Sequence, residues 1–164
     1  MPRYLRRNDT RRARSRFKGK KTEDIYGGIV TGGEIARRIV GVSGASEVFI
    51  EGIVAYSERA KTKRLGVKNS TLEKFKPVSE EVASEMLGGI EKDCDLAIST
   101  TGLAGPNSDD SGFPVGLCFI GVSFKGKRTI YKYNFTGNRN EIVSKGAETA
   151  LLLALDKIKT QGEE

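Results

Sequence analysis

The stretch Leu96-Ala97-Ile98-Ser99-Thr100-Thr101-Gly102-Leu103-Ala104-Gly105-Pro106 decides the fold. Its first five residues, 96–100, are apolar or small and predict a buried β-strand. The small residues that follow predict a loop whose backbone can approach a ligand closely. A strand of this kind is typical of a sheet that helices cover on both faces.

Helix and strand patterns alternate before this stretch, and a hairpin pattern follows it. Further strands are predicted over 24–30 and 48–56, the second apolar enough for the centre of a sheet, and a hairpin over 115–124 and 128–135 around Lys125-Gly126-Lys127. Helices are predicted over 33–40, 58–65, 70–75, 77–91 (with Ser79 as N-cap) and 140–159. This order predicts an α/β fold, a three-layer α/β/α sandwich on a mixed β-sheet.

The charge of the chain is unevenly distributed. The 164 residues have a net charge of +7, but residues 1–21 contain ten Lys or Arg and one acid, Asp9. We expect 1–21 to form a basic, flexible arm and 22–164 to form one domain. The arm could bind nucleic acid or an acidic partner, or simply keep the protein in solution.

Composition excludes several kinds of chemistry. The sequence has no histidine, which rules out Ser-His-Asp and Cys-His mechanisms and removes the commonest zinc ligand. Its two cysteines, Cys94 and Cys118, are expected to be reduced core residues. No apolar run is long enough to span a bilayer, and no secretory signal is present, so we expect a cytoplasmic protein.

Two polar segments follow predicted strands. Thr31 precedes Gly32-Gly33 at a strand-to-helix turn, where free backbone N–H groups suit a phosphate, a carboxylate or an oxyanion, and its hydroxyl can cap the helix or touch a ligand. Tyr56 and Lys61 lie where another strand ends and a helix begins. Lys61 is a candidate general base if burial lowers its pKa, or else one more exposed lysine; Tyr56 is a candidate for proton transfer.

The loop after the buried strand supplies the other candidates. They are Thr101, Gly102, Gly105 and Asn107, in a loop whose small residues let the backbone approach a ligand closely. The adjacent acids Asp109-Asp110 lack a third ligand, so we predict no metal.

Taken together, these segments resemble the C-terminal domain of CinA, the nicotinamide-nucleotide amidohydrolase family. The resemblance covers roughly residues 25–159. It rests on Thr31-Gly32-Gly33, Gly44-Ala45-Ser46, Tyr56-Ser57 with Lys61, Leu65-Gly66-Val67, Thr101 to Pro106, Pro114-Val115-Gly116 and Gly137-Asn138-Arg139.

The resemblance implies hydrolysis of the carboxamide of nicotinamide mononucleotide to nicotinic acid mononucleotide and ammonia, without cofactor or metal. It implies a serine nucleophile, Lys61 as the base that takes its proton, Tyr56 as support for that transfer, and Arg139 as a substrate-binding residue. Gly32 and Gly33, with the loop from Thr101, would line the pocket. A homodimer is implied as well.

The chain departs from the family pattern at the nucleophile. Where the family has Glu-Ser-Cys, this sequence has Gly28-Ile29-Val30. Three hypotheses follow. The preferred one is a nucleotide pocket that has lost its catalysis. The alternatives are an active deamidase with a displaced nucleophile (Thr31, or else Ser57 or Thr101), and a protein that acts through the basic arm.

Overall fold

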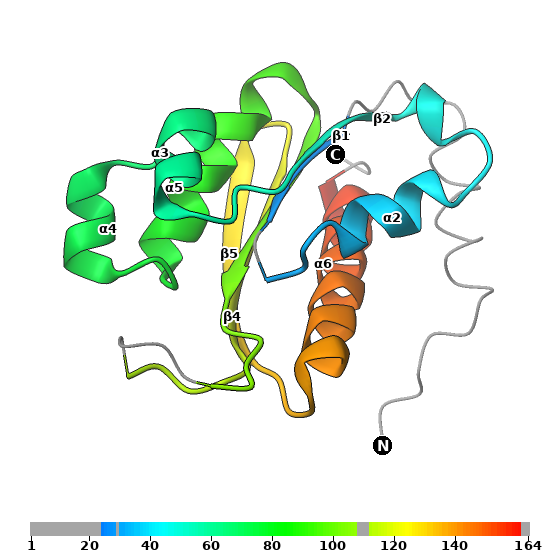
Figure 1. Ribbon diagram of the computed structural model, residues 1–164. Helices are drawn as coiled ribbons and strands as arrows, with labels where there is room; N and C mark the ends of the chain where they lie inside the picture. The colour runs from blue at the N-terminus through cyan, green and yellow to red at the C-terminus, as the bar shows by residue number, and fades with distance from the viewer. Residues whose placement is uncertain (1–23, 29, 108–111, 162–164) are drawn as a thin grey trace.

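The computed structural model describes residues 24–28, 30–107 and 112–161 (Figure 1). Five strands form one mixed sheet in the order β2-β1-β3-β4-β5. β1 pairs in parallel with β2 and β3, whereas β4 is antiparallel to both β3 and β5. The strands are β1 (Asp24–Gly28), β2 (Phe49–Ile53), β3 (Leu96–Gly102), β4 (Leu117–Phe124) and β5 (Lys127–Asn134).

Helices pack against both faces of this sheet (Figure 1). On one face, α3, α4 and α5 share a core cluster with residue 97 of β3. On the other, α2 and α6 share a cluster with residues 96 and 98 of the same strand. The helices are α2 (Glu34–Val40), α3 (Glu58–Leu65), α4 (Asn69–Phe75), α5 (Glu80–Ile90) and α6 (Arg139–Gln161), with short 3-10 helices at Ala45–Glu47 and Glu91–Asp93.

The prediction of a mixed α/β fold is confirmed. The helix predictions agree with the structure to within a few residues at each end, and Ser79 caps α5 as predicted, its hydroxyl accepting a hydrogen bond from the Val82 amide at 3.3 Å. The finer prediction of a three-layer sandwich stays a prediction.

One strand prediction was wrong in its place in the sheet. The segment 48–56 contains β2, which lies at the edge of the sheet and is not central. Ile50 is 47 % exposed and Val54, just beyond the strand, is 51 % exposed. The apolar content of this segment therefore reflects exposed side chains at an edge, which a pattern of apolar residues alone does not distinguish from burial.

The hairpin of β4 and β5 turns more tightly than predicted. Its turn is Lys125-Gly126, with φ of 50° and 78°. Two left-handed residues form the kind of turn whose twist suits a two-residue hairpin.

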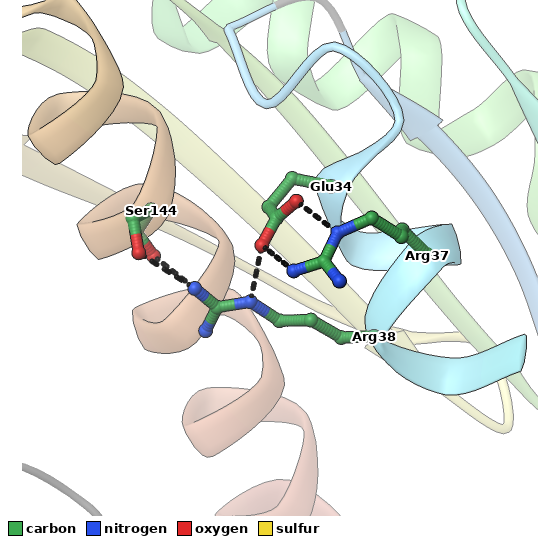
Figure 2. A network of polar contacts seen from close by, with 4 residues as sticks. All are labelled: Glu34, Arg37, Arg38 and Ser144. Carbon is green, nitrogen blue, oxygen red and sulfur yellow. Dashed lines mark hydrogen bonds and ion pairs between the residues drawn. The ribbon is translucent and has the colours of Figure 1, made fainter. Parts of the chain in front are cut away.

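A network of polar contacts joins α2 to α6 (Figure 2). Glu34 accepts hydrogen bonds from Arg37 Nε at 2.6 Å and from Arg38 Nε at 2.8 Å. Arg38 also donates to the Ser144 hydroxyl at 2.7 Å. The Arg37 hydrogen bond is the main cause that lowers the pKa of Glu34 from 4.5 to about 2; burial opposes it and Arg38 assists.

Replacing Glu34 by Gln is expected to lower the free energy of unfolding by about 1 kcal/mol at neutral pH, allowing for solvent screening of these ion pairs. Because the folded-state pKa of Glu34 is lowered, its stabilisation is present above about pH 4.5 and is lost as the pH falls towards about 2. Urea unfolding of both proteins across this range measures the difference. A difference that stays constant with pH would contradict the assignment.

No helix within residues 24–28, 30–107 and 112–161 is both long enough and apolar enough to span a membrane.

Candidate functional site

The candidate segments gather at one end of the sheet, the end at which the parallel strands β1, β2 and β3 finish; we call it the carboxyl edge. Residue 27 of β1 pairs with residue 53 at the end of β2, and residue 28 pairs with Thr100 near the end of β3. The same edge holds the start of β4 and the end of β5, because residue 102 pairs with 118, and residue 117 with 134. The carboxyl ends of parallel strands are where open α/β sheets bind ligands. The segments that leave or enter the strands there are 30–33, 54–57, 103–107, 113–116 and 135–139.

Backbone hydrogen bonds tie three of these segments together. The Gly116 amide donates to the Leu103 carbonyl at 2.7 Å, and the Phe135 amide donates to the Gly116 carbonyl at 2.9 Å. Gly116 has φ of 96°, and a Cβ there would lie 1.9 Å from the Phe135 carbonyl oxygen. Only glycine fits where residue 116 passes so close to Phe135. The glycine of the motif 114–116 is therefore explained by the fold itself.

Thr31 is buried between β3 and α6. It is 2 % exposed, and its hydroxyl lies 3.2 Å from the Thr100 hydroxyl. Its methyl group lies towards α6, since a Cβ added to Gly146 would be 3.8 Å from it. The sequence left open a cap or a ligand contact for this hydroxyl; the structure places it on Thr100, and α2 has no side-chain cap.

Gly32 and Gly33 form the predicted turn into α2. Both have left-handed φ values, 54° and 91°, which favour glycine. A Cβ on Gly33 would lie 3.7 Å from Val54, so this turn lies beside the segment that leaves β2. Anion binding by their amides stays a prediction, and the Glu34 carboxylate in the first turn of α2 opposes it.

Lys61 is a buried lysine. It lies in the first half of α3 and is 3 % exposed, whereas its neighbours Arg59, Lys63 and Arg64 are exposed. Burial lowers the pKa of Lys61, opposed by the charge of Glu58. Within the described residues its ammonium group makes no hydrogen bond or ion pair. The interpretation of Lys61 as one more exposed lysine is therefore wrong.

Tyr56 and Ser57 differ from Lys61 in exposure. Tyr56 is 65 % exposed, and no hydrogen bond joins it to Lys61 in the part of the chain that the structure describes. The Ser57 hydroxyl accepts a hydrogen bond from the Ala60 amide at 3.1 Å and caps α3. This hydroxyl already has a structural partner.

The loop after β3 is held mainly by contacts within the protein. The Thr101 hydroxyl donates to the Pro77 carbonyl at 2.7 Å on the α5 side of the sheet. A Cβ on Gly102 would lie 2.5 Å from the Leu117 carbonyl oxygen, and one on Gly105 would lie 2.7 Å from Val115. Thr101, Gly102 and Gly105 thus have packing reasons to be what they are, and their predicted contacts with substrate stay predictions.

Arg139 and Asn107 lie at the same edge. Arg139, at the start of α6, donates a hydrogen bond to the Gly105 carbonyl at 2.6 Å. The structure therefore brings the predicted substrate-binding arginine to the predicted loop. Asn107 is exposed.

Thr100 is the residue that sequence reasoning missed. Side chains alternate along a strand, so Thr100 lies on the face of β3 opposite to Thr101. It is fully buried, and its hydroxyl pairs with that of Thr31. Its place beside the end of β1 depends on strand order, which the sequence does not reveal.

Several predictions lie outside the described residues: those on Ile29, on Asp109-Asp110 and on the arm 1–21. Among the residues described, no group of three His, Cys, Asp or Glu side chains is arranged to hold a metal ion. Cys94 and Cys118 are not joined by a disulfide; Cys118 is buried, as predicted, and Cys94 is half-buried. Burial raises the pKa of Cys118 to about 12.

Comparison with known proteins gives matches to one family. The profile of the CinA C-terminal domain matches residues 27–158. A CinA-like protein of Kosmotoga olearia is 50 % identical over 123 residues, and one of Fusobacterium nucleatum is 49 % identical over 121; each match covers 74 % of this chain. The chain spans about 30 % of the length of these curated relatives.

Solved structures match over nearly the whole fold. Competence damage-inducible protein A of Klebsiella pneumoniae has a TM-score of 0.88 at 26 % identity, covering 93 % of this chain and 96 % of that one. The competence/damage inducible protein CihA of Agrobacterium tumefaciens has a TM-score of 0.84 at 31 % identity, covering 90 % and 93 %.

Proposed function

The chain belongs to the CinA C-terminal domain family, the competence/damage-inducible family, and from this premise we propose that it binds nicotinamide mononucleotide or a related nucleotide at the carboxyl edge of its sheet with little or no hydrolysis. Fold and family alone do not establish this activity, because one fold hosts many functions. The proposal rests on particular residues of this edge.

The observation that carries the proposal is the burial of Lys61. Burial of a lysine opposes its charged form, and lysines with a lowered pKa are common where a ligand or a proton transfer uses them. Lys61 is 3 % exposed, its pKa is lowered by burial, and it has no hydrogen bond among the described residues. In the chain, Lys61 comes shortly after the end of β2, and Val54 at this strand end lies beside Gly33.

The resemblance supplies the chemistry that this lysine would serve. Water replaces the amide nitrogen of the carboxamide, so that nicotinamide mononucleotide and water give nicotinic acid mononucleotide and ammonia. A nucleophile would attack the amide carbon, and neutral Lys61 would accept its proton, with Tyr56 assisting and Arg139 holding the substrate. A lowered pKa suits Lys61 to the role of base.

Impaired catalysis is proposed because Ile29 stands where the family pattern has serine. Isoleucine has no lone pair and cannot attack a carbonyl carbon. The alternative, with Thr31 as nucleophile, is less favoured by the contacts of this residue. Its hydroxyl is paired with Thr100, which is not a base, and attack geometry tolerates displacements of about 1 Å poorly.

Three further expectations belong to this proposal. Helices on both faces of the sheet support the three-layer α/β/α description. A homodimer is implied by the family resemblance. Nucleic-acid binding through residues 1–21 rests on their charge alone, and we keep it as an alternative.

Calorimetric titration with nicotinamide mononucleotide, together with an assay of ammonia release, tests the proposal. We expect saturable heat and no release above that of Lys61→Ala. Absence of heat with nicotinamide mononucleotide and with nicotinic acid mononucleotide would contradict nucleotide binding. Release that is lost in both Lys61→Ala and Thr31→Ala would replace the proposal by the displaced-nucleophile alternative.

A further inference from the structure

The face of β3 that meets α2 and α6 is apolar except at one position. Leu96 and Ile98 belong to the core cluster on this face, and Thr100 continues the alternation. Valine has nearly the shape of threonine, so packing alone gives no reason for a hydroxyl at this position. The hydroxyl of Thr100 therefore has a polar purpose, and its partner is Thr31.

Both hydroxyls depend on each other for hydrogen bonding. Thr100 is 0 % and Thr31 is 2 % exposed, and the 3.2 Å contact between their Oγ1 atoms satisfies both. Within the described residues neither side chain has another hydrogen bond. Removing either hydroxyl would leave the other buried without a hydrogen bond. Because an unsatisfied buried hydroxyl is costly, the remaining threonine is expected to shift.

The pair lies where the chain leaves the sheet. Thr100 is the register partner of Gly28, the last residue of β1, and Thr31 begins the turn that runs through Gly32 and Gly33 into α2. Since the methyl of Thr31 lies towards Gly146 of α6, its side chain is fixed by β3 on one side and by α6 on the other.

We infer that Thr100 is a positioning residue of the candidate nucleotide site: through the Thr31 hydroxyl it holds the turn 31–33 in the arrangement that nucleotide binding requires. This inference rests on the proposed function. Thr100 itself is buried behind Thr31 and is not assigned a contact with the ligand.

The test compares Thr100→Val, which keeps the shape and removes the hydroxyl, with Thr100→Ser, which keeps the hydroxyl. Ser99→Ala is the matched control, because Ser99 is equally buried on the same strand and donates to the Ala83 carbonyl at 2.8 Å on the other face. We expect Thr100→Val to weaken nicotinamide mononucleotide binding about tenfold, the loss of about one hydrogen bond, with Thr100→Ser and Ser99→Ala close to the unmodified protein. Equal weakening by Ser99→Ala would overturn the inference.

Amide hydrogen exchange without ligand separates this inference from the proposed function. Faster exchange at residues 31–34 in Thr100→Val, but not in Ser99→Ala, is expected even if the unmodified protein binds no nucleotide. In that case the proposed function fails and the positioning of the turn stands. Unchanged exchange at these amides in Thr100→Val would overturn the positioning role, whatever the protein binds.

Discussion

Changing Gly28, Ile29 and Val30 to Glu, Ser and Cys is expected to raise the rate of ammonia release from nicotinamide mononucleotide by on the order of 10⁴, the scale on which loss of a serine nucleophile lowers the rate of other enzymes. The physical reason is that the proposed base and pocket are in place, and the triple change supplies the attacking oxygen that the unmodified chain lacks. The measurement is the initial rate of ammonia release from the purified triple variant and the unmodified chain.

Two controls sharpen this experiment. The single variant Ile29→Ser separates the nucleophile from its two neighbours. Thr31→Ala in the triple variant examines whether Thr31 contributes to the restored reaction. If the triple variant binds nicotinamide mononucleotide but releases no ammonia, the loss of the serine does not explain impaired catalysis in this chain, and the proposal fails in that part.

Replacing Lys61 by Met in the triple variant is expected to lower the restored rate by on the order of 10³, the usual scale of general-base catalysis. Methionine fills a similar space without a charge, so a loss of rate reports on proton transfer and not on a cavity. Lys63→Met on the exposed side of α3 is the matched control, and it should leave the rate within about twofold, as expected of a surface change.

The same substitution has a pH signature in stability. Because burial lowers the folded-state pKa of Lys61, the unfolded chain binds more protons between that pKa and 10.5, and Lys61 makes stability rise with pH in that range. Lys61→Met should remove this rise, and should stabilise the protein most at the low-pH end of that range, where Lys61 is charged in both states. A Lys61→Met protein that keeps the slope in urea unfolding would show that Lys61 is not the titrating group.

The sequence predicted the elements well where local patterns determine them. The predicted N-cap Ser79 placed the start of α5, and the apolar run of residues 96–100 predicted the buried core of β3. The place of β2 was mispredicted because its apolar side chains are exposed at an edge, and strand order depends on contacts between distant segments.

The candidate site was predictable as a set of segments and less so as a set of contacts. The strand ends that carry Thr31, Tyr56 and Thr101 meet at one edge, as strand-end reasoning predicts. The burial of Lys61 and the pairing of Thr31 with Thr100 could not be predicted, because each depends on how helices and strands pack together. The sequence predicted that Thr101 contacts substrate, whereas in the structure its hydroxyl donates a hydrogen bond to the Pro77 carbonyl.

The outer edge of β2 has a consequence for how the molecules behave when crowded. In the part of the chain that the structure describes, β2 is the end strand of the sheet and pairs with β1 on one side, and Ile50 is exposed on this strand. Such an edge is a template for strand addition and aggregation. Glu51 is exposed in the middle of the strand and places a negative charge there, and the neighbouring Gly52 adds no apolar side chain. Neutralising Glu51 would remove a charge that opposes the addition of a strand from a second molecule.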